Sequence, residues 1–338
     1  MSARWARPLL LIALVAGLLA AVAAQLATGS AVSATSTWSA VFGEADPLTT
    51  QIVHDLRMPR VLVGAGAGAC LGIAGIALQV VLRNPLASPD VTGVGSGAVL
   101  GAVVTTSVGG DFASPTAMVL VAIVGGTLGG GALWLVSLRA GSDPVRLAVI
   151  GVVLSAALGG VTLVLLTARP QLTGSMTRWL IGSLNGRTWS HWSALWPWLV
   201  VAAVSGLLVS AVLQVLAIDD DHGRGIGLAV APWRSAVLLV AVLATAVAIA
   251  SVGAMAFVGL LAPHAARAMF GADHRFALPA SALLGAATVC GADSVAQEIT
   301  ARVPGTALAG MPTGAVTALI GAAVLVRVAR RTTVIGGR

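Results

Sequence analysis

The residues whose types could support chemistry are few, and one group of them is compact. The segment Asp219-Asp-Asp-His222 offers three carboxylates and an imidazole, which are ligand types found in metal sites. Adjacent residues in a tight turn cannot all point at one ion, so a solvated acidic turn is favoured over a metal site. We therefore expect no metal site here.

Two further ionisable residues stand inside apolar stretches. His264 follows Pro263, and Asp293 interrupts a run of small and apolar residues. Within a membrane such groups must face protein, water or headgroups, because exposure to lipid costs about 3 kcal/mol or more. For His264 a hydrogen-bonded position at a helix end is favoured over a ligand role. For Asp293 pairing within a helix bundle is favoured over proton carriage.

Motifs of catalysis and of nucleotide binding are missing from the sequence. A phosphate loop needs a lysine, and every one of the 19 basic residues is an arginine. His-Glu-x-x-His, Cys-x-x-Cys and a Ser-His-Asp motif context are also missing. We expect no enzymatic activity and no bound cofactor, so any ATP would be hydrolysed by another polypeptide.

The overall composition explains why polar residues are so rare. Of 338 residues, 57% are hydrophobic and 9% are charged, against about 25% charged residues in soluble domains. A spanning helix takes about 20 apolar residues, so the chain fits a polytopic membrane protein. This composition excludes a soluble enzyme, a disordered chain and a disulfide-stapled secreted domain. Cys70 and Cys290 are expected to be buried thiols.

Ten membrane elements are predicted, all α-helical and forming a single membrane domain over 1–338. Nine are apolar runs of spanning or nearly spanning length, and the tenth, 256–270, is shorter and contains Pro263. The first run could instead be a signal peptide, although it is long for one. The predicted helices are 8–28, 58–82, 93–108, 116–138, 146–167, 192–216, 235–252, 256–270, 277–298 and 311–328.

An even number of elements places both termini on one side of the membrane. Thirteen of the 19 arginines then fall on the side of the termini, which predicts a cytoplasmic location for that side. The net charge of +7 is accounted for by topology and lipid headgroups and does not imply nucleic acid. The six outward arginines are Arg57, Arg60, Arg169, Arg178, Arg187 and Arg302.

Glycine is abundant inside the apolar runs, with 41 in the chain. Small residues let membrane helices approach closely, so close packing is the favoured interpretation. Flexible helices along a translocation path are the alternative.

Four motifs together carry a family resemblance that extends from about residue 57 to about 328. They are Arg57-Met-Pro-Arg60, Asn84-Pro-Leu-Ala87 with Gly93-Val-Gly, Phe257-Val-Gly-Leu-Leu-Ala-Pro-His264 with Arg267, and Asp273-His-Arg275 followed by Leu278-Pro279. With these motifs the chain closely resembles the iron-siderophore and cobalamin permeases of ABC importers. The resemblance implies a ten-helix type II importer subunit in the cytoplasmic (inner) cell membrane. It also implies three kinds of partner: a second permease in a homo- or heterodimer, two ABC ATPase subunits and an extracytoplasmic binding protein.

The resemblance also implies where three sites lie. Outward arginines Arg57 and Arg60 would dock the binding protein, with Arg302 compensating for an arginine that is replaced here by Gln297. A cytoplasmic gate would comprise Asn84 and Leu86 after the second helix and Asp143, Pro144 and Val145 between the fourth and fifth. Contact with the ATPase would come from the segment between the sixth and seventh spans, with Asp219, Asp220, Asp221, His222, Gly223, Arg224, Ile226 and Leu228.

The coupling segment contains residues that are unusual in a helix, and the outward arginines have an alternative role. Gly223 and Gly225 fall where the coupling helix should run, so that helix is expected to form fully only against its partner. For the outward arginines, headgroup contact or capping of local carbonyls is the alternative to docking.

The outward segment 169–192 carries Trp179, Trp189 and Trp192. An interfacial belt is favoured for these tryptophans, and a vestibule surface is the alternative. Its string Gly182-Ser-Leu-Asn-Gly-Arg187 resembles siderophore-type members more than cobalamin-type ones. The sequence therefore predicts a permease that moves a ferric siderophore by alternating access. Cobalamin or haem import, a proton-coupled transporter relying on Asp293 and Glu298, and a polytopic membrane enzyme are the alternatives.

Overall fold

Helices make up almost all of the computed structural model over the residues that it describes, which are 3–29, 31–109, 114–140, 144–168, 170, 173–303 and 310–335. Ten helices correspond one by one to the ten predicted elements, and no strand occurs in the described residues, so the all-α fold is confirmed. They are α1 (Ala3–Ala27), α4 (Met58–Val81), α5 (Val94–Gly109), α6 (Pro115–Ala140), α7 (Pro144–Ala168), α9 (Trp189–Leu216), α11 (Val230–Val252), α12 (Val258–Phe270), α13 (His274–Arg302) and α14 (Thr313–Ile335).

Short helices fill the connections that the sequence left as loops. On one side lie α2 (Ala34–Val41), α3 (Pro47–Gln51) and α8 (Thr173–Ile181), and on the other lie η2 (Pro89–Val91) and α10 (Asp220–Gly225). A π-helical turn, η1 (Ile52–Arg57), joins α3 to α4 without a break. Asp46 caps α3 by accepting a hydrogen bond from the Thr49 amide, at 3.1 Å, and Pro47 occupies the first turn.

Seven helical segments of the described chain are long and apolar enough to cross a membrane. These are Arg7–Ala27, Pro47–Val81, Pro115–Val136, Ala148–Ala168, Trp189–Leu216, Val230–Val252 and His274–Arg302. The apolar parts of α5 and α14 are shorter, and α12 has only 13 residues. At about 1.5 Å per residue, α12 reaches about 20 Å, less than the hydrocarbon core of about 30 Å.

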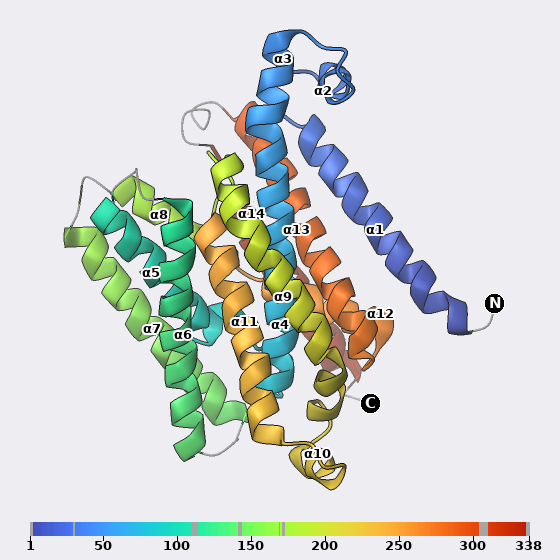
Figure 1. The fold of residues 1–338 in the computed structure, drawn as a ribbon, viewed down its shortest axis with the longest axis vertical. Helices are drawn as coiled ribbons and strands as arrows, with labels where there is room; N and C mark the ends of the chain where they lie inside the picture. Colours follow the sequence, from blue (N-terminus) through green and yellow to red (C-terminus); the bar gives the residue numbers. More distant parts are fainter. Residues whose placement is uncertain are drawn as a thin grey trace.

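The arrangement in Figure 1 places α4 and α11 among the other helices, with α5–α8 on one side and α1 on the other. Helix α4 is the most deeply buried element, packed between α13, α11, α9 and α12. Helices α2 and α3 lie at the upper end, whereas α10 lies at the lower end, and the start of α1 lies well below its end (Figure 1).

Glycines bring the central helices into backbone contact, which confirms the packing interpretation. A methyl group at Gly68 of α4 would overlap the backbone of Gly285 in α13. One turn along, the Ser281 hydroxyl donates to the Gly72 carbonyl at 2.8 Å. Helices α5 and α6 meet in the same way at Gly97 and Gly125. The predicted burial of Cys70 and Cys290 is also confirmed.

Candidate functional sites at the two ends of the bundle

At the upper end, one buried carboxylate joins four helices. Asp293 of α13 is 0% exposed and accepts hydrogen bonds at both oxygens. Its Oδ2 receives Arg60 Nε at 2.7 Å, Gln25 Nε2 at 2.7 Å and Gln297 Nε2 at 2.9 Å. Its Oδ1 receives Arg60 Nη2 at 2.8 Å and Thr313 Oγ1 at 2.7 Å. The expected pairing of Asp293 inside the bundle is therefore confirmed.

This network takes up most of the acceptor capacity of the Asp293 carboxylate. Five donors surround it, from one residue each of α1, α4 and α14 and from one residue of α13 itself. Two of the five come from the Arg60 guanidinium, which gives the contact the two-point geometry of an arginine–carboxylate pair. Gln297, which stands where the family resemblance led us to expect an arginine, contributes one of these donors.

Arg57 is buried, so its guanidinium faces protein and not solvent. Only 9% of the residue is exposed. Its Nη1 donates to the Leu26 carbonyl at 2.8 Å and to Thr37 Oγ1 at 2.9 Å, and its Nη2 donates to the Val32 carbonyl at 3.0 Å. These contacts match the alternative considered for the outward arginines, in which the arginine caps local backbone carbonyls. The arginine ties the link between α1 and α2 to the start of α4.

The three arginines expected at the docking surface thus differ in access. The Arg60 side chain is 19% exposed and bound to Asp293, whereas the Arg302 side chain is 77% exposed and pairs with Glu298 one helical turn away. The docking role of all three stays a prediction, and Arg302 is the one whose charge is presented to solvent.

The outward segment before α9 packs into the bundle more deeply than expected. Trp179 of α8 is 5% exposed, which contradicts an interfacial position for this residue. Its Nε1 donates to Thr106 Oγ1 at 3.1 Å, and the Arg187 guanidinium lies 4.9 Å from its ring centroid. Burial, together with the nearby positive charges of Arg178 and Arg60, lowers the pKa of Arg187 to about 10. Trp189 is exposed, and its Nε1 donates to the His54 carbonyl at 2.9 Å.

At the lower end, the turn after α4 presents Leu86 to solvent. Arg83 adopts a positive φ of 48°, and the Asn84 side-chain oxygen accepts a hydrogen bond from the Leu86 amide at 2.9 Å. Leu86 is 60% exposed. An apolar side chain held out by a rigid turn fits the predicted gate, although the gate itself stays a prediction.

The second half of the predicted gate is only partly described. Asp143 lies outside the described residues, Pro144 begins α7, and Val145 lies in its first turn. The turn after α4 is tied to α7, because the Gly93 amide donates to Ser155 Oγ at 2.9 Å. Movement of α7 would therefore be transmitted to this turn.

Sequence reasoning missed Asp90, which connects the same turn to the start of α12. Its carboxylate accepts a hydrogen bond from the backbone amide of Phe257, and burial raises its pKa to about 6. Phe257 has a positive φ of 66°, which is rare for a bulky residue. Its side chain packs where a Cβ on Gly321 of α14 would lie. An aspartate that directly follows Pro89 in a turn with two prolines is the signal that the sequence offered.

The predicted coupling segment forms a complete short helix in the isolated chain, contrary to expectation. The Asp219 carboxylate caps α10 by accepting from the His222 amide, and Gly227, with a φ of 82°, follows its end. Gly223 is closely packed, because a Cβ there would lie 2.9 Å from Val230 Cγ2 and would require that side chain to shift.

The surface of this segment is polar with an apolar tip. Asp220 begins α10. Asp221 pairs with Arg224 at 3.2 Å, and the side chains of Asp221 and Arg224 are strongly exposed. Ile226 is 59% exposed, whereas Leu228 is half-buried. The assignment of these residues to an ATPase contact stays a prediction.

His264 differs from the sequence expectation. It lies in the middle of α12, not at a helix end, and its side chain is exposed. Pro263 is accommodated inside the helix.

Comparisons with known proteins agree with this geometry. The FecCD transport family matches residues 12–331. The ferric enterobactin permease FepG of Escherichia coli is 36% identical over 78% of this chain and 79% of its own length. The Fe(3+) dicitrate permease FecD of the same organism is 36% identical, covering 80% and 82%. The cobalamin permease BtuC of Halobacterium salinarum is also 36% identical, covering 82% and 73%.

A solved structure has the same fold. The chain matches a protein described as a metal-chelate type ABC transporter in an inward-facing conformation, with a TM-score of 0.80 and 27% identity. The match covers 96% of this chain and 99% of the other.

Proposed function

The chain belongs to the FecCD transport family and is an ABC importer permease for substrates of iron-chelate, citrate or cobalamin type, and we propose that its own substrate is a ferric siderophore. The observation that carries this choice is the similarity to FepG and FecD, both named for ferric chelates, over about four-fifths of each chain. The segment Gly182–Arg187, which resembles siderophore-type members, supports the same choice.

The proposed assembly contains two permeases, two ATPases and one binding protein in the cytoplasmic (inner) membrane. A second permease is implied because similarity extends to both FepG and FepD, two permeases named for one ferric enterobactin system. The chain has no lysine and so no phosphate loop, which is why a separate ATPase is needed.

At the upper end, the binding protein would dock on the rim formed by α2, α3 and the end of α13. Arg302 and Glu298 offer exposed charges for this contact, and rim charges mainly steer association. Arg57 and Arg60 would act through the segments that they hold in place, since one caps the α1–α2 link and the other is bound to Asp293.

At the lower end, ATP-driven closure of the ATPases would act on α10 and Ile226. Helix α10 lies directly between α9 and α11, so displacing it would shift both. The gate formed by Asn84 and Leu86 with Asp143, Pro144 and Val145 would then open or close as α7 pulls on the adjoining turn.

The substrate is tested by uptake into proteoliposomes that contain the permease with its ATPase. Radiolabelled iron supplied as enterobactin-type and hydroxamate-type chelates is compared with radiolabelled cobalamin. We expect ATP-dependent, vanadate-sensitive uptake of a ferric chelate. Vesicles without the ATPase are the control and should show none.

Cobalamin import is the second candidate, favoured by the similarity to the Halobacterium salinarum permease. Saturable cobalamin uptake without uptake of any ferric chelate would replace the siderophore proposal. Uptake driven by a proton gradient in the absence of ATPase would instead favour a secondary transporter.

A further inference from the structure

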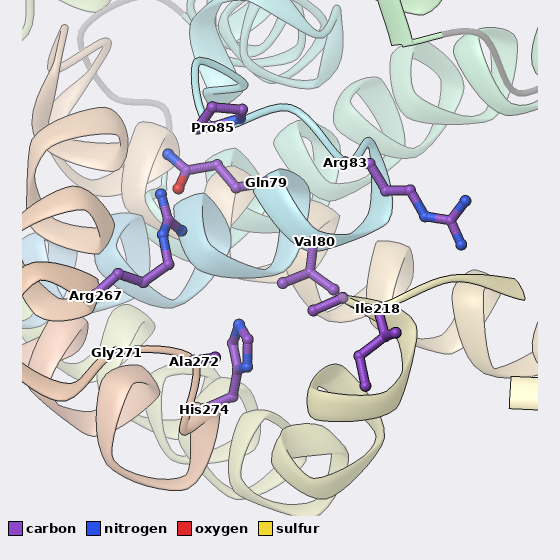
Figure 2. Close-up of a pocket in the computed structure, with 10 residues that line it drawn as sticks. Gln79, Val80, Arg83, Pro85, Ile218, Arg267, Gly271, Ala272 and His274 are labelled. Atoms are coloured by element: carbon purple, nitrogen blue, oxygen red, sulfur yellow. The ribbon is translucent and has the colours of Figure 1, made fainter. Parts of the chain in front are cut away.

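The lower end of the bundle contains a cavity of about 440 Å³ that is lined by none of the residues assigned above to the gate or to the coupling segment. It lies between the end of α4, the end of α9 and the turn that joins α12 to α13. Figure 2 shows Gln79 and Arg267 directed toward a common space and the ring of His274 reaching toward it from the other side. Arg83 also lines the cavity but points away from these three (Figure 2).

Two of these side chains are buried with polar atoms that have no partner. Gln79 is 4% exposed, and neither its Oε1 nor its Nε2 makes a hydrogen bond. His274 is 2% exposed, and its Nδ1 is likewise unsatisfied. A buried polar atom without a partner has lost its hydrogen bonds to water and gained none in return, so such atoms call for a ligand or a functional reason. Gln79 is also the one amide in the otherwise apolar run of α4 after Arg60.

The charge at this cavity is positive. Arg267 is half-buried, forms no ion pair within the described chain and lies close enough to His274 to act on its charge. No acidic residue lines the cavity, and Asp273, beside the lining residue His274, is already bound to Arg7 at 2.7 Å and accepts from the Arg275 amide. Asp219, beside the lining residue Ile218, accepts from the His222 amide. A cation is therefore disfavoured, whereas an anion that has both acceptor oxygens and a hydroxyl could accept from the guanidinium and the amide and donate to Nδ1 of the imidazole, whose ring also bonds the Ala272 backbone.

We propose that this cavity binds an oxyanion of the phosphate class, held by Arg267, Gln79 and His274. At neutral pH phosphate has acceptor oxygens for Arg267 and Gln79 and retains a P–OH group that can donate to His274 Nδ1. It could come from a free phosphate or from the headgroup of an anionic lipid, because the cavity lies at the end of the bundle that the arginine distribution assigns to the cytoplasm. The site is independent of the identity of the transported substrate.

Equilibrium binding of radiolabelled inorganic phosphate to the purified full-length chain tests the free-anion source. We expect one phosphate per chain, with affinity reduced about tenfold or more in Arg267→Gln. Gln79→Glu, which is nearly isosteric, should abolish binding because its carboxylate repels the anion and pairs with Arg267. The matched control is Arg275→Gln, an exposed arginine of the same turn that does not line the cavity.

Native mass spectrometry after reconstitution in vesicles of phosphatidylcholine with phosphatidylglycerol tests the lipid source. If a lipid headgroup occupies the site, wild type and Arg275→Gln retain one phosphatidylglycerol that Arg267→Gln and Gln79→Glu lose. The proposal is overturned if neither phosphate nor phosphatidylglycerol binds. It is equally overturned if binding is the same in wild type and Arg267→Gln, since the anion would then lie elsewhere.

Discussion

Arg60 and Asp293, 233 positions apart in the chain, form a two-point ion pair with distances of 2.7 Å and 2.8 Å. The pair fixes the upper part of α4 against α13, just above the level where glycines bring these two helices into backbone contact. Because Asp293 also binds Gln25 and Thr313, the same carboxylate fixes α1 and α14. The first and last membrane helices therefore meet through one residue.

Removing the carboxylate should unbalance this network. We expect Asp293→Ala to destabilise the chain by about 3 to 5 kcal/mol, because the Arg60 charge would remain partly buried without its partner. The measurement is thermal unfolding in detergent together with the yield of monodisperse protein. Glu298→Ala, which removes an exposed pair on the same helix, is the control and should cost less than about 1 kcal/mol. Equal costs for the two variants would argue against a central role for Asp293.

Filling the contact between α4 and α13 should force these helices apart. In Gly68→Val the new side chain overlaps the backbone of Gly285, so we expect a loss of about 3 kcal/mol or failure to assemble. Gly17→Val in α1 is the control, since nothing lies within 4 Å of a Cβ at that position. The two variants are compared by gel-filtration profile and unfolding temperature. A stable Gly68→Val protein would show that this contact is dispensable.

Trimming the exposed side chain in the turn after α4 should weaken the gate. Leu86→Gly is expected to raise the passive leak of reconstituted vesicles. The hydrogen bond between Asn84 and the amide of residue 86 keeps the turn in place, while the apolar side chain that would close the pathway is removed. Leu86→Met preserves apolar bulk and should remain tight. Leak is followed by dye efflux without ATP, and a Leu86→Gly protein as tight as wild type would count against a gate at this position.

The apolar tip of the coupling segment should be needed for the ATPase. Ile226→Asp places a charge at an exposed position on the lower end, so we expect loss of co-purification or uncoupling of hydrolysis from uptake. Leu48→Asp, at an exposed leucine on the opposite end, is the control for ATPase contact and should leave co-purification of the ATPase intact. If Ile226→Asp retains the ATPase and its stimulated hydrolysis, α10 is not the coupling element.

Asp90 should make stability depend on pH between about pH 4 and pH 6. Its pKa is raised from 3.8 to about 6 by burial, so the folded chain holds this proton to a higher pH than the unfolded chain does. The associated stabilisation is present below about pH 4 and is lost as pH rises through 6. Asp90→Asn should flatten this slope and be the more stable protein at pH 7.

Unfolding temperatures measured from pH 4 to pH 8 check this dependence. The control is Asp46→Asn, because Asp46 is an exposed helix cap whose pKa is lowered by its hydrogen bonds with Thr49. A slope that persists unchanged in Asp90→Asn would assign it to another group.

The sequence by itself determined the class of fold, the ten membrane elements and the family. Hydrophobic run length and the placement of arginines are properties of local segments, and a lipid environment requires each apolar segment to form its own backbone hydrogen bonds. Element identity therefore follows from composition without knowledge of neighbours. The turn around Asn84 and Leu86 was accessible in the same way, because Asn and Pro specify turn geometry within a few residues.

Only the tertiary structure decided which polar groups meet. Gln25 and Asp293 are 268 positions apart, and Arg57 reaches across to the link between α1 and α2. The roles of Gly223, Asp90 and Gln79 likewise depend on what lies opposite each of them. The physical reason is that a polar side chain in an apolar bundle is defined by its partner, and the partner is set by helix register. That register is fixed by backbone contacts such as Gly68 with Gly285, whose partners no local pattern specifies.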